Sequence, residues 1–147
     1  MLYLYIVLAL IILLIIYMRL EAAAVEVNHI SFTKRKKCLK ILHLSDIHIN
    51  HLKVSWKKVK NVIEQEKPDF VFMTGDYIES AKHISKFLEF LSYIKGDNKF
   101  YLCLGNHDHK ALNHDETAIA DFKNAIESAG VHVVSNNAIH YMKNNSI

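Results

Sequence analysis

The chain has 147 residues, about half of them apolar, and a net charge of +3 at pH 7. This length supplies material for one globular domain at most. The small net charge, without a basic stripe interleaved with aromatic residues, argues against a nucleic-acid partner. Cys38 and Cys103 lie far apart and form no zinc or redox motif, so we expect buried free thiols rather than a disulfide framework.

The first 18 residues contain no charged side chain. A helix of that length rises about 27 Å, close to the hydrocarbon thickness of a bilayer. We therefore predict a transmembrane helix over 1–18 that anchors the protein in the lipid bilayer in a single pass. The alternative is a cleaved secretory signal, for which Ala22, Ala23 and Ala24 could supply the processing site. Against a signal, no basic residue precedes the apolar run, and the run exceeds the usual length of a signal core.

A basic linker is predicted over 19–38. Arg19 and the run "KRKK" at 34–37 place positive charge after the apolar helix, whereas only the α-amino group precedes it. The positive-inside rule then places the remaining chain in the cytoplasm. We therefore expect a protein of the cell membrane whose folded domain, residues 39–147, lies on the cytoplasmic side.

Short apolar runs alternate with amphipathic segments after the linker. Strands that alternate with helices indicate an α/β fold with a largely parallel sheet and right-handed crossovers. His43 lies inside the first strand and is expected to pack in the core, whereas His83, on the second helix, is assigned no role. The pattern predicts strands at 38–45, 69–75, 99–104, 131–135 and 138–142, and helices at 54–66, 80–94 and 115–129.

Polar residues follow the first three strands, in "SDIH", "TGDY" and "LGNHDH". Asp46, Asp76 and Asn106 recur at intervals of 30 residues, and each interval is one strand-helix-strand unit. Active sites of such sheets lie beyond the carboxyl ends of the strands, so these oxygen ligands should meet at one edge. The nearby His48 and His107 would join them there. We interpret "LGNHDH" as a loop of ligands at a strand end.

This set of donors suits a metal centre. Carboxylates, an amide oxygen and imidazoles favour Mn, Fe or Zn, and the absence of thiolates argues against a structural zinc site. One carboxylate can bridge two cations about 3.5 to 4 Å apart, and such a pair can activate water and hold a phosphoryl oxygen. Two divalent metal ions are therefore the expected cofactor.

"SDIH", "GDY" and "GNHD", in this order on successive strands, resemble the first three motifs of the calcineurin-like metallophosphoesterases. The resemblance implies a four-layer α-β-β-α sandwich, with two sheets flanked by helices. It also implies a hydrolase that cleaves a phosphomonoester, a phosphodiester or a lipid pyrophosphate through a dimetal-activated hydroxide. The apolar N-terminal helix adds lipid-linked phosphates to the candidate substrates.

The same resemblance implies a role for each matching residue. Asp46 and His48 would bind the first metal. Asp76 would bridge both metals, and Asn106 would bind the second through its amide oxygen.

Two further residues would act in catalysis by the same resemblance. His107 would stand near the leaving group, as proton donor or as stabiliser of the developing charge. Asp108 would orient His107.

The sequence departs from the family in one respect. The family's second half supplies further histidines in a Gly-His motif and a Gly-His-x-His motif, and neither occurs here. We therefore expect residues 39–147 to form the N-terminal half of the sandwich, with the C-terminal half absent. Three explanations stay open. The sequence is a fragment or a frameshifted gene product, another chain supplies the missing half, or the protein is a truncated, catalytically inactive membrane protein that keeps the motifs without turnover.

Overall fold

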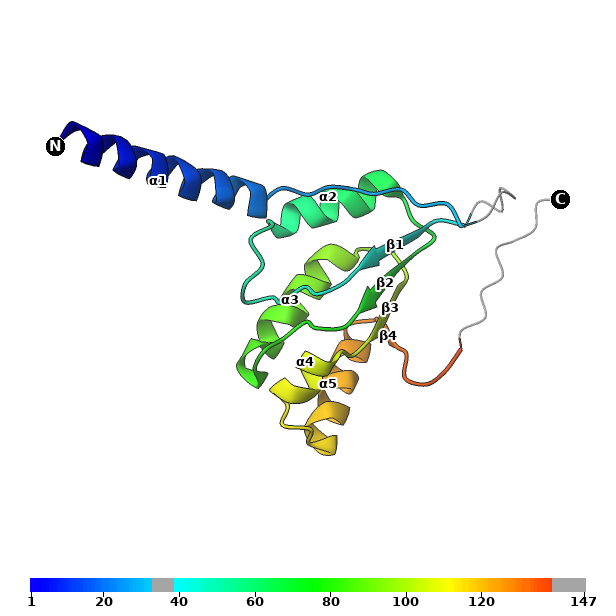
Figure 1. The fold of residues 1–147 in the computed structure, drawn as a ribbon. Helices are drawn as coiled ribbons and strands as arrows, with labels where there is room; N and C mark the ends of the chain where they lie inside the picture. The colour runs from blue at the N-terminus through cyan, green and yellow to red at the C-terminus, as the bar shows by residue number, and fades with distance from the viewer. Residues whose placement is uncertain (33–38, 139–147) are drawn as a thin grey trace.

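The computed structural model describes residues 1–32 and 39–138, and Figure 1 shows how they are arranged. A parallel sheet packs with its connecting helices, while helix α1 (Leu2–Ala22) projects away from them at the N-terminus. The expected α/β class is confirmed. The predicted strand at 138–142 falls almost entirely outside the described residues, as does Cys38.

Helix α1 is apolar and fully exposed. It has 21 residues, none of them buried, and its most apolar stretch has a mean hydropathy of 2.5. Among the described residues it is the one helix long and apolar enough to cross a membrane. A signal sequence passes the same test of length and composition, so the helix supports membrane contact without separating an anchor from a signal.

The sheet contains four parallel strands whose spatial order equals their chain order. Leu44 pairs with Met73, and Thr74 pairs with Cys103, so the strands end at a common edge. Each crossover returns the chain to the neighbouring strand, which confirms the prediction from the alternating pattern. The strands are β1 (Ile41–Leu44), β2 (Phe70–Thr74), β3 (Phe100–Cys103) and β4 (His132–Val133).

Two of the helices begin at residues whose side chains cap the first turn. Ser55 accepts a hydrogen bond from the Lys58 backbone nitrogen, and Asp115 accepts one from that of Ala118. These caps satisfy backbone donors that a first helical turn leaves unpaired. The predicted helix at 80–94 is divided into a short 3₁₀ turn and a longer helix. The elements are α2 (Trp56–Glu66), η1 (Ala81–His83), α3 (Ile84–Lys95) and α5 (Glu116–Ser128).

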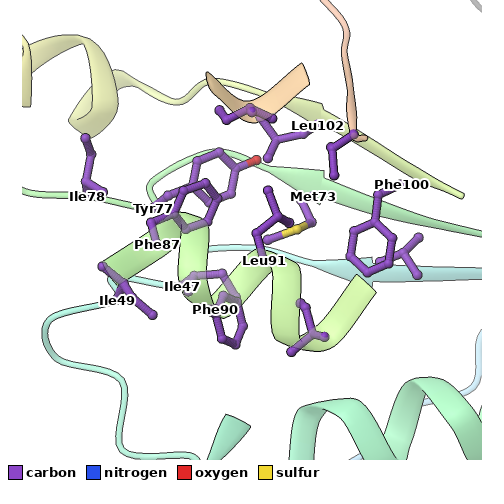
Figure 2. Packing of buried hydrophobic residues seen from close by; sticks show 14 of the residues in the cluster. Ile47, Ile49, Met73, Tyr77, Ile78, Phe87, Phe90, Leu91, Phe100 and Leu102 are labelled. Atoms are coloured by element: carbon purple, nitrogen blue, oxygen red, sulfur yellow. The ribbon is translucent and has the colours of Figure 1, made fainter. Parts of the chain in front are cut away.

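The core lies between α3 and one face of the sheet. Apolar residues of α3 recur at helical spacing and are almost completely buried: Phe87, Phe90, Leu91 and Ile94. Burying each such side chain stabilises the fold by roughly 1.5 to 3 kcal/mol. Figure 2 shows the side chains of Phe87, Phe90 and Leu91 in one cluster with strand residues, among them Met73, Phe100 and Leu102.

His43 is not a core residue, contrary to expectation. Side chains alternate along a strand, and Leu42 and Leu44 of β1 pack against the core, so His43 takes the other face and is exposed. Its Nε2 lies 2.6 Å from the Thr74 hydroxyl oxygen. Rings of β2 to β4 contact one another on this same face, with centroids 5.7 Å apart for Phe72 and Tyr101.

The last four residues of the "LGNHDH" segment begin a helix rather than a loop. Helix α4 (Asn106–Ala111) begins directly after Gly105, which has an extended backbone. The Asp108 side chain accepts a hydrogen bond from the Gly105 nitrogen at 2.9 Å and so caps the first turn. Cys103, just before this turn, is a partly buried free thiol.

Candidate metal centre

The chain segments that follow β1 and β2 run side by side beyond the sheet. The backbone nitrogen of His48 donates to the Asp76 carbonyl oxygen, and that of Ile49 donates to the Tyr77 carbonyl oxygen, both at 2.9 Å. The Asp46 nitrogen bonds the Gly75 carbonyl oxygen at 3.3 Å. These bonds continue the pairing of the two strands and bring their terminal side chains to the same edge.

Three of the predicted metal ligands have a left-handed backbone. The φ angles are +52° for Asp46, +40° for His48 and +60° for Asp76. Residues other than glycine rarely adopt this region, and when they do so the surrounding structure must hold them there. Such strain gathers at functional sites, and here it coincides with the predicted ligands.

Asp46, His48 and Asp76 form a compact donor group. One ligand atom of each lies within 4.8 Å of the others. Two atoms bonded to one ion at about 2.1 Å lie at most about 4.2 Å apart, so a small closure suffices for a shared ion. In the described part of the chain, this is the one group of three or more His, Cys, Asp or Glu residues with such spacing. Two carboxylates and an imidazole fit a divalent transition metal.

Two glycines allow β2 and α4 to approach closely at this edge. A Cβ atom on Gly75 would lie 2.6 Å from the Gly105 Cα, and a Cβ on Gly105 would lie 2.6 Å from the Asp76 nitrogen. Neither contact is sterically possible, so only glycine fits both positions. Because of this approach, the His107 backbone nitrogen donates to Asp76 Oδ1 at 3.0 Å.

The start of α4 brings His107 beside the donor group. Its ring lies edge-on to the His48 ring, with centroids 5.2 Å apart and an interplanar angle of 83°. Asn106 is exposed and begins α4 next to His107. The Asn106 backbone therefore lies beside Asp76, and the binding of metal by its amide stays a prediction.

The Asp108 carboxylate connects the turn after β2 with the start of α4. It is completely buried, and its Oδ2 accepts hydrogen bonds from the Asp76 and Gly105 nitrogens, both at 2.9 Å. Its Oδ1 accepts from the Tyr77 nitrogen at 2.8 Å and the Ile78 nitrogen at 3.0 Å. Burial raises the pKa of the Asp108 carboxyl, and the four backbone donors act in the opposite direction.

The four hydrogen bonds to Asp108 come from backbone nitrogens and not from the His107 ring. Both oxygens of Asp108 are occupied by backbone donors of two segments. Asp108 holds the first turn of α4, which carries His107, against the turn after β2. A part for either residue in the reaction stays a prediction.

Glu79 is a neighbour of the site that the sequence did not predict. Its Oε1 lies 2.9 Å from His48 Nδ1. The signal that could have pointed to it is an acidic residue three positions after Asp76, in "GDYIE". His83, which was assigned no role, lies against the second oxygen of Glu79.

A cavity adjoins the donor group on the side of His107. It has a volume of about 570 Å³ and lies between the start of η1 and helix α4. Lys110 contributes a positive charge one turn after His107. The cavity is lined by Glu79, Ser80, Ala81, His107, Lys110, Ala111 and Asn113.

The profile of the calcineurin-like phosphoesterases matches residues 39–145, most of the chain. The chain belongs to this family. The predicted family is thereby confirmed. The calcineurin-like metallophosphoesterases are hydrolases that act on phosphate esters and usually bind divalent metals. Among the described residues, Asp46, His48 and Asp76 form a group that could hold such a metal.

Curated relatives of this calcineurin-like chain include a protein described as an uncharacterised metallophosphoesterase, YkoQ of Bacillus subtilis strain 168. The two are 31% identical over 99 residues, which cover 62% of this chain and 37% of YkoQ. LpxG of Chlamydia trachomatis, named a UDP-2,3-diacylglucosamine pyrophosphatase, is 31% identical over 61% of this chain and 30% of its own length. LpxG of Chlamydia muridarum is 35% identical over 48% of this chain and 23% of its own.

The chain thus matches little more than a third of the length of these relatives, or less. No solved structure matches the chain significantly.

Proposed function

We propose that this chain carries the metal-binding segment of a phosphoesterase that hydrolyses a phosphate ester. The observation that carries the proposal is the convergence of Asp46, His48 and Asp76, all with left-handed backbones, within 4.8 Å of one another. Strained polar residues that meet at the carboxyl edge of a parallel sheet favour a catalytic centre over a chance surface cluster.

Four residues would hold the two divalent ions: Asp46 and His48 at one ion, Asp76 at both, and Asn106 as one ligand of the second. The pair of ions, when bound, supplies an activated hydroxide and neutralises charge on the phosphoryl oxygens. The backbone bond from His107 to Asp76 Oδ1 fixes one oxygen of the bridging carboxylate.

His107 then donates a proton to the leaving oxygen or stabilises its developing charge. Its ring borders both the donor group and the cavity beside α4. That position suits a group that acts between the ions and the departing part of the substrate.

The cavity supports a substrate with more than one anionic group. Lys110 lines this cavity as well and can pair with a second phosphate. Two relatives are named as pyrophosphatases of UDP-2,3-diacylglucosamine, a diacylated and therefore lipid-linked compound. The finer substrate that we propose is a lipid-linked pyrophosphate, in which water would cleave the phosphoanhydride bond to give two phosphomonoesters.

The full chain, purified in detergent with Mn²⁺, tests the proposal. Bound metal is measured by mass spectrometry, and hydrolysis is measured with aryl phosphomonoesters, aryl phosphodiesters and a lipid pyrophosphate. Asp76→Asn should lose bound metal and activity, whereas Asp121→Asn, the same change on the exposed surface of α5, should keep both. Unchanged metal content in Asp76→Asn would contradict the assignment. Metal binding without hydrolysis of any substrate would support the alternative of motifs kept without turnover.

We further propose that α1 anchors the protein and that the folded part lies in the cytoplasm. Its exposed apolar surface and the basic residues that follow it support this orientation. The full chain should resist alkaline extraction from membranes, and a C-terminal tag should be digested by protease in inside-out vesicles. Digestion in right-side-out vesicles instead would contradict the orientation. Release of a shortened chain by alkali would indicate a cleaved signal.

A further inference from the structure

The carboxylate of Glu79 lies between two histidine rings. Oε1 is 2.9 Å from His48 Nδ1, and Oε2 is 3.4 Å from His83 Nδ1. The three side chains are largely shielded, with 24% of Glu79, 30% of His48 and 13% of His83 exposed. The three residues come from different places in the fold: the turn after β2, the turn after β1 and the end of η1.

The contact between Glu79 and His83 involves two atoms that have no other hydrogen-bond partner among the described residues. Glu79 Oε2 and His83 Nδ1 are both buried, and neither makes a hydrogen bond with other protein atoms there. A buried polar atom without a partner costs about 1 to 3 kcal/mol. The two atoms lie 3.4 Å apart, so each is the nearest candidate partner for the other.

The contact with Glu79 decides which nitrogen of His48 can bind a metal. An ionised carboxylate only accepts hydrogen bonds, so Nδ1 of His48 must carry the proton that it donates. The lone pair is then on Nε2, the atom that remains free for an ion. Carboxylates that hold metal-binding histidines in this way fix the ring orientation and raise ligand basicity.

We propose that Glu79 is a positioning residue that sets the tautomer and orientation of the metal ligand His48, and that His83 holds Glu79 in place. Oε1 of Glu79 accepts the N–H of His48, and Oε2 lies 3.4 Å from Nδ1 of His83, so the carboxylate is placed between the two rings. The role rests on the proposed metal site. It also connects that site to η1 and α3, which carry no predicted ligand.

A purely structural role for Glu79 predicts different results. It would change the stability of the fold and leave the tautomer of His48 and the affinity for metal unchanged. Two measurements on the full chain in detergent separate the two roles. One is the ¹⁵N spectrum of labelled histidines, which reports the tautomer without metal. The other is titration with Co²⁺, whose visible absorption reports affinity and coordination geometry.

Glu79→Ala should shift the His48 signal away from the Nδ1–H form. The same variant should weaken Co²⁺ binding about 10- to 100-fold, the usual effect of losing such a carboxylate. His83→Gln should weaken it by a smaller factor, since Glu79 keeps its bond to His48. Glu89→Gln, on the exposed surface of α3, should change neither measurement.

Glu79→Gln covers the case in which the alanine variant fails to fold, because it retains the volume of the side chain. It should also disturb the tautomer or the affinity, since one terminal atom becomes a donor. A lower melting temperature with unchanged tautomer and affinity would overturn the positioning role. Failure of the unchanged chain to bind Co²⁺ would instead overturn the proposed function, and the ¹⁵N spectrum would still decide whether Glu79 sets the tautomer.

Discussion

The core beneath α3 and the carboxyl edge of the sheet differ in backbone conformation and in the polarity of their buried side chains. The core is built from regular elements with apolar side chains, and Phe87, Phe90 and Leu91 are fully buried. The edge, only a few residues along the chain, places Asp46 and Asp76 in left-handed backbones beside a buried carboxylate. Strain and buried charge are tolerated at the edge because the neighbouring core holds both strands in place. Stability and function therefore lie in adjacent but separable regions.

Removal of core packing should give the largest loss of stability. Phe87 is fully buried, stacks on Tyr77 with centroids 4.7 Å apart and meets Phe122. Phe87→Ala should lower the free energy of unfolding by about 3 to 5 kcal/mol through lost contacts and a cavity. Urea denaturation measures the change, and Phe32→Ala, at a 94% exposed position, is the matched control. If the folded fraction also lost its affinity for metal, the two regions would not be separable.

Substitution of Asp108 should affect both the stability of the core and the binding of metal at the edge. Asp108→Asn replaces one oxygen by an amide that faces backbone donors of Asp76 and Gly105 or of Tyr77 and Ile78. We expect a loss of about 2 to 4 kcal/mol in the free energy of unfolding, together with weaker metal binding. Denaturation and Co²⁺ titration of the same sample measure both. A variant as stable as the parent would show that the backbone bonds matter little.

Gly105→Ala should act mainly on the edge. The new Cβ would lie 2.6 Å from the Asp76 nitrogen, so α4 must move away from Asp76. We expect about 1 to 3 kcal/mol of destabilisation from overpacking and a loss of metal affinity of about tenfold or more. Gly96→Ala is the control for the close approach: its φ of +50° disfavours a side chain, but the nearest atom to the new Cβ is 3.9 Å away. Equal effects of the two variants on metal binding would contradict the close approach.

Ser55→Ala should have the smallest effect. It removes the cap of α2, whose hydroxyl accepts from the Lys58 nitrogen at 3.3 Å. The expected loss is about 1 kcal/mol in the free energy of unfolding, with metal binding unchanged. A thermal melt and a Co²⁺ titration check the two parts. Weaker metal binding in this variant would show that helix stability alone controls the edge.

The sequence by itself determined the class of the fold and the neighbourhood of the site. Hydrophobic periodicity and helix caps are local signals, so they predicted the β2, β3, α2 and α5 segments within a few residues. The motifs at the strand ends predicted that Asp46, His48 and Asp76 would meet, because parallel strands end at one edge.

Only the tertiary structure decided how those residues are held. The bond between His48 and Glu79 joins positions 31 apart, and Asp108 binds Tyr77 across a similar separation. Such contacts depend on how two turns pack, and residue type does not encode them. The structure also decided that His43 is exposed, because the other face of β1 packs against the core. It decided that "NHDHKA" is helical, where Asp108 caps the first turn. The left-handed backbones at Asp46, His48 and Asp76 arise because the folded core over-determines those positions, which local propensity alone would not favour.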